Sequence, residues 1–260
     1  MSQFWKPFVG SLFVVSLVSA IAGVVRADGP AWSVKSSLEA PEAHQAAAAD
    51  DEFVFAIASK VVAKYDRRSG AKIAVSAGEA EHLNSGFLQD GKLYCAHSNY
   101  PKTPERSEIK VLDTQAMRLS TFKDFGNYGG SLTWAVCERG RWWCNFARYG
   151  NDNSQTFLVE FDEQWRELRR WTYPADVIRH IGQMSLSGGL WREGCLLVTD
   201  HDHPILYQLR LPDEGNELAF VATQSVPFTG QGIAADPVTG GLVGINRAKR
   251  QILFAERDAN

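Results

Sequence analysis

SLTWAVCERGRWWCNFARY, residues 131–149, followed by FLVEFDE at residues 157–163, is the stretch of sequence that decides the fold. It opens with small and polar residues, crosses a charged turn that contains Gly, and continues as an apolar strand, a polar loop and a second apolar strand. The same order of features recurs along the chain, which therefore contains an internal repeat. Its five copies cover residues 45–67, 83–114, 131–163, 185–210 and 231–256.

Each repeat predicts a meander of four strands once a trailing strand is added, such as residues 118–122 or 168–172. Repeats of about 40 to 50 residues match the blade period of β-propellers. We therefore predict an all-β protein, a five-bladed β-propeller. An ordinary β-sandwich is the alternative, because short strands at regular spacing also suit that fold. The blades are expected at about residues 42–78, 79–126, 127–174, 180–226 and 229–258.

The ends of the chain indicate how the ring is closed. The last repeat reaches Asn260 before any fourth strand, whereas an alternating apolar and polar stretch at residues 32–38 precedes the first repeat. We predict that this N-terminal strand completes the last blade, which leaves no open sheet edge.

The first residues form a different kind of segment. Lys6 precedes an apolar stretch at residues 8–25, which ends at Val25-Arg26-Ala27, a small-residue cleavage site. This pattern predicts a signal peptide at residues 1–27 and a single propeller domain at residues 28–260. An uncleaved membrane anchor is the alternative, because the apolar stretch is near the length that spans a bilayer. We expect a secreted or periplasmic monomer with no stable membrane span after cleavage.

Composition excludes several classes of function. The chain has 27 basic and 30 acidic residues and no basic run, so nucleic-acid binding is not expected. It contains no Gly-x-Ser-x-Gly elbow, P-loop or dinucleotide fingerprint. A glycosidase needs two placed carboxylates, and the repeat openings offer mainly His, Gln and Ser.

The cysteines are interpreted as small buried apolar residues, with disulfide bridges as the alternative. A symmetric hairpin through the turn at residues 138–141 sets Cys137 opposite Trp142 and not opposite Cys144. Cys95 and Cys195 lie in other repeats, and no CxxC spacing supports a thiolate metal site.

Propeller geometry predicts one functional face. The innermost strand of each blade starts on the face where the second strand ends, so the repeat openings and the second-strand exits form one surface, which carries all six histidines. The openings contribute His44, Gln45, Glu81, His82, Asn84, Ser131, His180, Gln183, Ser185 and Gln231. The exits contribute Lys60, His97, Asn99, Tyr100, Arg148, Tyr149, Asp200, His201, Asp202, His203, Asn246 and Arg247.

Clustered imidazoles suit acid–base chemistry near neutral pH, although a single loop histidine is commonly a solvated residue. We predict His97, His82 and His201 as catalytic candidates. Arg148 and Arg247 are suited to grip a carboxylate or phosphate, or else to hold loop backbones. The predicted ligand-binding residues are His44, Gln45, Asn99, Tyr100, Arg148, Gln183, Gln231 and Arg247.

The densest constellation is Asp200-His201-Asp202-His203-Pro204. Alternate residues of an extended strand point the same way, which would place His201 beside His203. With His97 or His180 from a neighbouring blade, two imidazoles could complete a divalent metal site. We predict His201, His203 and His97 as ligands; a solvated polar turn before the proline is the alternative.

Several strings resemble a group of secreted bacterial five-bladed propellers of unestablished activity, across residues 42–256. They are Asn84-Ser85-Gly86, LYCAHSNYP at residues 93–101, GSLTW at residues 130–134 and GQGIA at residues 230–234. Residues 232–236 are more loosely similar to plant-type glutaminyl cyclotransferases, which are also five-bladed. The resemblance implies fold and export, and it implies no catalytic residues.

These patterns predict an exported propeller that binds a small polar ligand or a glycan at a histidine-rich channel mouth. A hydrolase, a lyase or a cyclising enzyme would fit such a site. The alternative is a non-catalytic propeller that binds a protein or a glycan, with its histidines scattered around the rim. The sequence does not decide between enzyme and binding scaffold.

Overall fold

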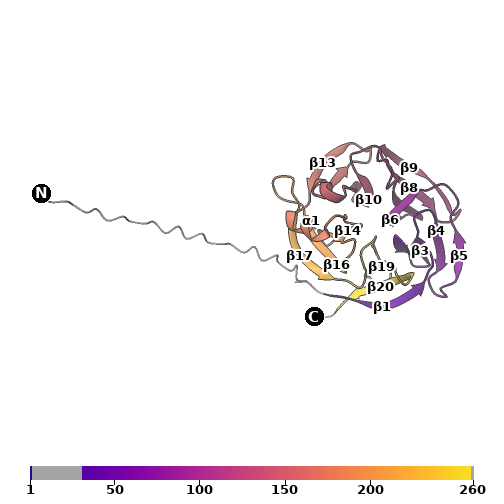
Figure 1. Cartoon of the computed structure of the whole chain (residues 1–260). Helices are drawn as coiled ribbons and strands as arrows, with labels where there is room; N and C mark the ends of the chain where they lie inside the picture. The colour runs from indigo at the N-terminus through magenta and orange to yellow at the C-terminus, as the bar shows by residue number, and fades with distance from the viewer. Residues whose placement is uncertain (2–30, 259–260) are drawn as a thin grey trace.

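The computed structural model describes Met1 and residues 31–258. The strands of this second range form five four-stranded antiparallel sheets around one axis (Figure 1). The predicted all-β, five-bladed propeller is confirmed, and the alternative β-sandwich is wrong. The predicted signal peptide and its cleavage site lie outside the described residues, apart from Met1. Among the described residues, no helix has the length and hydropathy of a membrane-spanning helix.

Blades one to four are meanders whose strands run in chain order from the axis outward (Figure 1). Blade one contains β2 (Ala46–Ala49), β3 (Phe53–Ile57), β4 (Val62–Asp66) and β5 (Lys72–Val75). Blade two contains β6 (His82–Gln89), β7 (Lys92–Ser98), β8 (Ser107–Asp113) and β9 (Arg118–Gly126). Blade three contains β10 (Ser131–Glu138), β11 (Arg141–Ala147), β12 (Phe157–Phe161) and β13 (Glu167–Thr172). Blade four contains β14 (Gly188–Arg192), β15 (Cys195–Thr199), β16 (Ile205–Arg210) and β17 (Ala219–Ser225).

Blade five is built from both ends of the described chain. Its strands are β18 (Ala234–Ala235), β19 (Leu242–Asn246), β20 (Gln251–Arg257) and, on the outside, β1 (Trp32–Glu39). β1 pairs antiparallel with β20, with Trp32 opposite Arg257 and Glu39 opposite Gln251. The predicted closure by an N-terminal strand is therefore confirmed.

Trp32 anchors this closing strand. The Trp32 side chain is buried, and its Nε1 donates a hydrogen bond to Oε1 of Gln224 at 2.8 Å. The guanidinium carbons of Arg192 and Arg257 lie 5.1 and 5.3 Å from the ring centroid, within cation–π range. The closing strand is therefore held by side-chain contacts as well as by its backbone pairing.

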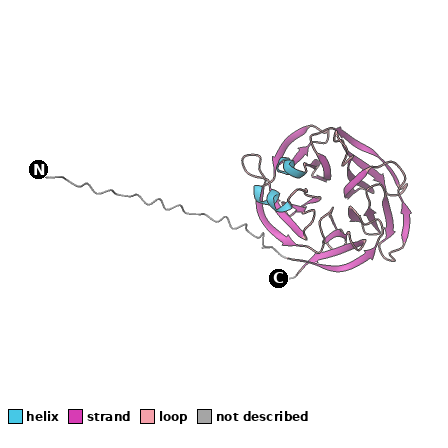
Figure 2. Ribbon diagram, in the orientation of Figure 1, coloured by secondary structure: helices cyan, strands magenta, loops and turns pink. Residues whose placement is uncertain are grey.

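Among the described residues, two helices interrupt the sheet pattern. Both are drawn in cyan in Figure 2. A short 3-10 helix, η1 (Gly150–Gln155), lies in the loop between β11 and β12, and α1 (Ala175–Ile181) lies between blades three and four. Neither was expected from the sequence. The buried residues Val177, Ile178 and Ile181 of α1 pack onto the core, so the residues that lead into blade four are helical and its first strand begins only at Gly188.

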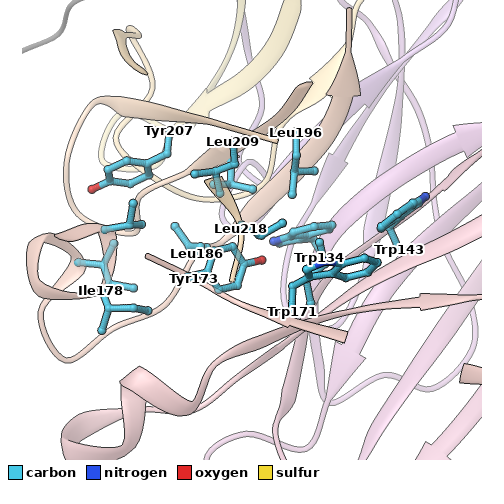
Figure 3. Close-up of a cluster of buried hydrophobic side chains, with 14 of the residues drawn as sticks. Trp134, Trp143, Trp171, Tyr173, Ile178, Leu186, Leu196, Tyr207, Leu209 and Leu218 are labelled. Atoms are coloured by element: carbon cyan, nitrogen blue, oxygen red, sulfur yellow. The ribbon is translucent and has the colours of Figure 1, made fainter. Parts of the chain in front are cut away.

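The core lies between neighbouring blades, and its largest cluster joins blades three and four (Figure 3). Trp134 of β10 is fully buried against β14. A Cβ added at Gly189 would lie 2.6 Å from the Trp134 ring, so only glycine lets the two innermost strands approach this closely. Large aromatic residues thus fill the space between blades.

The four cysteines form no disulfide bond, and Cys137 lies opposite Trp142, as the symmetric hairpin register predicts. Cys95, Cys144 and Cys195 are buried, whereas Cys137 is half-buried.

Candidate functional site

One end of the central channel opens into a cavity of about 250 Å³, called here the mouth cavity. Its walls come from the repeat openings and the second-strand exits, the two groups of segments that the sequence placed on one face. The residues of these groups that line it are Gln45, His82, Asn84, Tyr100, Tyr149, Ser185, His201, Gln231 and Arg247. Thr133, Met184 and Ser187 complete the lining.

The mouth cavity carries the positive charge of Arg247 in its lining. Arg247, His82 and His201 line it, and no Asp or Glu of the described residues does. Burial lowers the pKa of the Arg247 guanidinium, and nearby Arg250 lowers it further, while Asp202 acts in the opposite direction. Arg247 is therefore a half-buried cation. An anion bound beside it would offset the free-energy cost of removing its charge from water.

Two histidines at this end are held neutral. Arg247 donates from Nη2 to Nε2 of His44 at 3.0 Å, and an imidazole nitrogen that accepts a hydrogen bond carries no proton. Burial lowers the pKa values of His44 and His82, and the charge of Arg247 lowers them further. His82 is thus a neutral imidazole near pH 7, the state in which a side chain can accept a proton.

An aromatic wall flanks His82. The ring centroids of Tyr100 and Tyr149 lie 4.9 Å apart, and the His82 ring meets Tyr100 edge-on at 5.6 Å. Burial raises the pKa of Tyr149, which keeps its hydroxyl protonated. The wall therefore offers ring surface and phenol donors next to the imidazole.

The floor of the mouth cavity is built from oriented polar side chains. Gln45 donates to Oγ of Ser59 at 3.0 Å, and Asn84 donates to the carbonyl of Leu132 at 2.8 Å. The buried hydroxyl of Ser185 has no hydrogen-bond partner within the described part of the chain. Since a buried hydroxyl is normally satisfied, Ser185 is a free polar group that a ligand could engage.

His97 lies away from the mouth cavity, in a separate outer pocket beside Glu81 and Asn99. Its Nε2 accepts the backbone N–H of Glu81 at 2.9 Å, and its Nδ1 lies 3.3 Å from Oε2 of Glu108. Burial, followed by the charge of Lys110, lowers the pKa of His97 to about 4. The Nε2 atom is thus engaged within blade two, whereas the buried Nδ1 atom has no hydrogen-bond partner among the described residues.

Three predicted ligand-binding residues also serve loop structure. The amide of Asn99 donates to the carbonyl of Pro104 at 3.0 Å and accepts the N–H of Arg106 at 2.8 Å. Arg148 donates to the carbonyl of Gly129 at 2.8 Å, and the carbonyl of Gln183 accepts the N–H of Gly150. None of the three lines the mouth cavity.

The segment Asp200–His203 is a turn, which was the alternative interpretation of the sequence, and not an extended strand. Oδ1 of Asp200 accepts the N–H groups of Asp202 and His203 at 2.8 and 3.0 Å, the hydrogen-bond pattern of a side-chain-capped turn. His201 pairs with Asp202 at 2.7 Å, whereas Nδ1 of His203 lies 3.0 Å from Oδ1 of Asp200. The alternation expected to place His201 beside His203 is therefore wrong.

His203 is grouped instead with His180 of α1 and with Asp200. Their ligand atoms lie within 4.8 Å of one another, and within the described ranges this is the single group of at least three His, Cys, Asp or Glu side chains so arranged. It shares only His203 with the predicted set of His97, His201 and His203. His180 was among the predicted face residues, but its role depends on a helix that the sequence analysis missed.

Asp200 is ionised although it is buried. Burial raises the pKa of its carboxyl, but hydrogen bonds from the N–H of Asp202, the hydroxyl of Tyr207 and the N–H of His203 outweigh burial and lower it. Tyr207 donates to Oδ2 at 2.7 Å, and Nδ1 of His180 lies 3.4 Å from the same oxygen. A buried carboxylate between two imidazoles is a donor set that suits a divalent transition metal.

The fold and the axial cavity place this chain in the class of five-bladed β-propellers. No protein-family model and no curated protein matches the sequence. Among solved structures, the glutaminyl cyclase of Myxococcus xanthus is similar with a TM-score of 0.61 and 11% identity, covering 88% of this chain and 97% of that chain. A chain of a mitotic checkpoint complex is similar with a TM-score of 0.50 and 9% identity, covering 96% and 99%. Likeness at such low identity shows the fold alone.

Proposed function

We propose that the protein binds a small polar ligand with an anionic group, a carboxylate or a phosphate, in the mouth cavity. The observation that carries this proposal is the lining of the cavity by Arg247, His82 and His201 without a carboxylate. Arg247 offers the guanidinium fork that suits such anions, and the Ser185 hydroxyl and the tyrosine wall add uncharged groups. Export through the N-terminal segment, to the periplasm or the medium, belongs to the same proposal.

A divalent metal ion is the proposed cofactor of this end of the channel. His180, Asp200 and His203 would hold it, as two imidazoles and one carboxylate, which are the ligands of many open zinc sites. His201, between two of these residues in sequence, lines the mouth cavity. The metal would therefore lie beside the bound ligand, and its positive charge would strengthen the attraction of the site for an anion.

A hydrolase, a lyase or a cyclising enzyme fits this arrangement, with neutral His82 as the proton acceptor and His201 as a second acid–base candidate. Glutaminyl cyclisation is the first activity to assay, since the structurally similar Myxococcus protein is named a glutaminyl cyclase. The second candidate function is a non-catalytic propeller that binds a glycan. The exposed ring of Tyr100 beside Tyr149 favours it, because paired rings at a rim can stack on a sugar.

The ligand proposal is tested by calorimetric titration with inorganic phosphate and a panel of small mono- and dicarboxylates. We expect at least one anion to bind, and Arg247→Gln to weaken its binding by about tenfold or more, because a charged hydrogen-bonding partner contributes roughly 1.5–3 kcal/mol. Arg148→Gln is the matched control, since Arg148 occupies the corresponding exit of blade three but is tied to Gly129. Equal affinity of Arg247→Gln and the wild type would refute the proposal.

The metal proposal is tested separately with cobalt(II), whose visible spectrum reports its coordination, and with zinc(II) by calorimetry. One equivalent should bind to the wild type and to His201→Gln, and binding should be lost in His203→Gln. Loss in both variants, or no binding to the wild type, would contradict the assignment of His180, Asp200 and His203. Unfolding curves of each variant check that the fold is retained.

A further inference from the structure

The channel has a second cavity at its opposite end, where the turns between the first and second strands of the blades meet. Its volume is about 460 Å³. The interior is apolar, with Phe87, Val136, Leu190, Trp191 and Ile233 in its lining. A cavity of this size and composition lies within the range of small-molecule sites.

The two cavities are separated by close contact between the innermost strands. A Cβ added at Gly232 would lie 2.6 Å from the Cβ of Ala46 and 2.9 Å from the Cα of Ser85. One added at Gly188 would lie 2.9 Å from the Cα of Gly232. Blades one, two, four and five therefore touch between the two ends, and a ligand in one cavity does not occupy the other.

The two cavities differ in charge. Asp50, Asp90 and Glu138 line the second cavity, and no Lys, Arg or His of the described residues does. Asp50 is engaged by the N–H groups of Glu52 and Phe53. Asp90 forms no ion pair within the described part of the chain, and Glu138 pairs only with the exposed Arg139. Two carboxylates beside an apolar interior are therefore available to a cation.

We propose that the second cavity binds a small organic cation, an aryl or alkyl body that carries one ammonium group. The body would lie among Phe87, Leu190 and Trp191, and the ammonium would face Asp90 and Glu138. The rings add to this preference, because aromatic faces attract cations. This function is independent of the anion site that we propose at the mouth cavity.

Cys137 provides a direct probe of occupancy. It lines the second cavity and is half-buried, whereas the other three cysteines are buried. Burial raises the pKa of the Cys137 thiol, so alkylation should be followed at about pH 9, where more of the reactive thiolate is present. A ligand in the cavity would cover Cys137 and slow its alkylation, which peptide mass spectrometry measures at that residue alone.

The test compares three probes of nearly the same shape: phenethylammonium, phenethyl alcohol and phenylpropionate. We expect phenethylammonium to bind by calorimetry at pH 7 and to protect Cys137, with about tenfold or greater preference over the other two. Asp90→Asn and Glu138→Gln should each weaken phenethylammonium several-fold. Asn tolerates the positive φ of 51° at position 90, so the turn should persist.

Arg247→Gln is the control that separates the two proposals, since it should weaken anion binding at the mouth about tenfold or more and leave phenethylammonium binding unchanged. Equal binding of all three probes, no binding of phenethylammonium, or binding that leaves Cys137 unprotected would overturn the cation site. Melting temperatures of the variants within a few degrees of the wild type exclude unfolding as the cause of lost binding.

Discussion

Arg67 of blade one and Asp236 of blade five form an ion pair across the joint of the ring, with 2.8 Å between Nη2 and Oδ2. The Asp236 side chain is fully buried. Arg67 also donates to the carbonyl of Asp50 at 2.8 Å, and its guanidinium lies 4.8 Å from the ring of Phe254. Because β1 closes blade five through backbone pairing, this ion pair is a second and independent link between the first and last blades.

Asp236→Ala should lower the free energy of unfolding by about 3–5 kcal/mol, because it leaves the Arg67 guanidinium without its buried partner. Urea unfolding at pH 7 measures the change. Asp213→Ala removes an exposed carboxylate and should stay within about 0.5 kcal/mol of the wild type. Similar losses in both variants would contradict a specific role for the ion pair.

Trp32→Ala should lower the free energy of unfolding by about 3–5 kcal/mol, because it empties the site between Arg192 and Arg257 and frees the outer strand of blade five. Thermal unfolding followed by circular dichroism measures the change. Val34→Ala alters an exposed residue of the same strand and is the control. A Trp32→Ala variant as stable as Val34→Ala would show that the backbone pairing of β1 suffices.

Acidification should destabilise the protein through His97, whose pKa is lowered from 6.5 to about 4 in the folded state. The folded protein holds this imidazole neutral, so its contribution is fully present above pH 6.5 and is lost as the pH falls toward 4. The loss amounts to roughly 3 kcal/mol.

Chemical unfolding at pH 7 and pH 4.5 measures this dependence. His97→Gln should show a smaller difference between the two pH values than the wild type, whereas His201→Gln should retain the wild-type difference. An unchanged pH dependence in His97→Gln would assign the acid sensitivity to other groups.

Tyr173→Phe should cost about 1–3 kcal/mol, because the Tyr173 hydroxyl donates to Oδ1 of the buried Asn145 at 2.7 Å. Asn145 in turn donates to Thr133, which lines the mouth cavity, so ligand affinity should fall with stability. Tyr94→Phe removes a half-buried hydroxyl outside this network and is the control for both measurements. An unchanged free energy of unfolding in Tyr173→Phe would contradict the role of this bond.

Most of the fold could be predicted from the sequence because the strand and turn patterns that define a propeller blade are local. Alternating strands and turns set the blade order and the register of Cys137 with Trp142. The predicted placement of His201 beside His203 was wrong because the Asp200 side chain caps the backbone and forms the turn that the sequence analysis gave as the alternative to an extended strand. His180 belongs to the metal group only because the short helix α1 packs where it does. The short sequence of α1 shows no sustained apolar periodicity that would predict a helix.

The second cavity was not predicted for a different reason. Phe87 and Leu190 are apolar residues of innermost strands, and the sequence alone does not distinguish an apolar residue that packs on a neighbour from one that faces an open channel end. Only the spacing of the five innermost strands makes that distinction, and this spacing is set by contacts such as Gly189 on Trp134.

The pairing of β1 with β20 joins segments that lie about as far apart in the sequence as the described residues allow. The hairpins within each blade can form from neighbouring residues, whereas β1 must wait for β20, which is made after all the other strands of the described residues. Until then each molecule presents a free strand and a matching empty edge, the conditions under which two molecules exchange identical elements. Refolding at high concentration should therefore yield strand-exchanged dimers, and refolding at high dilution should favour the self-closed ring.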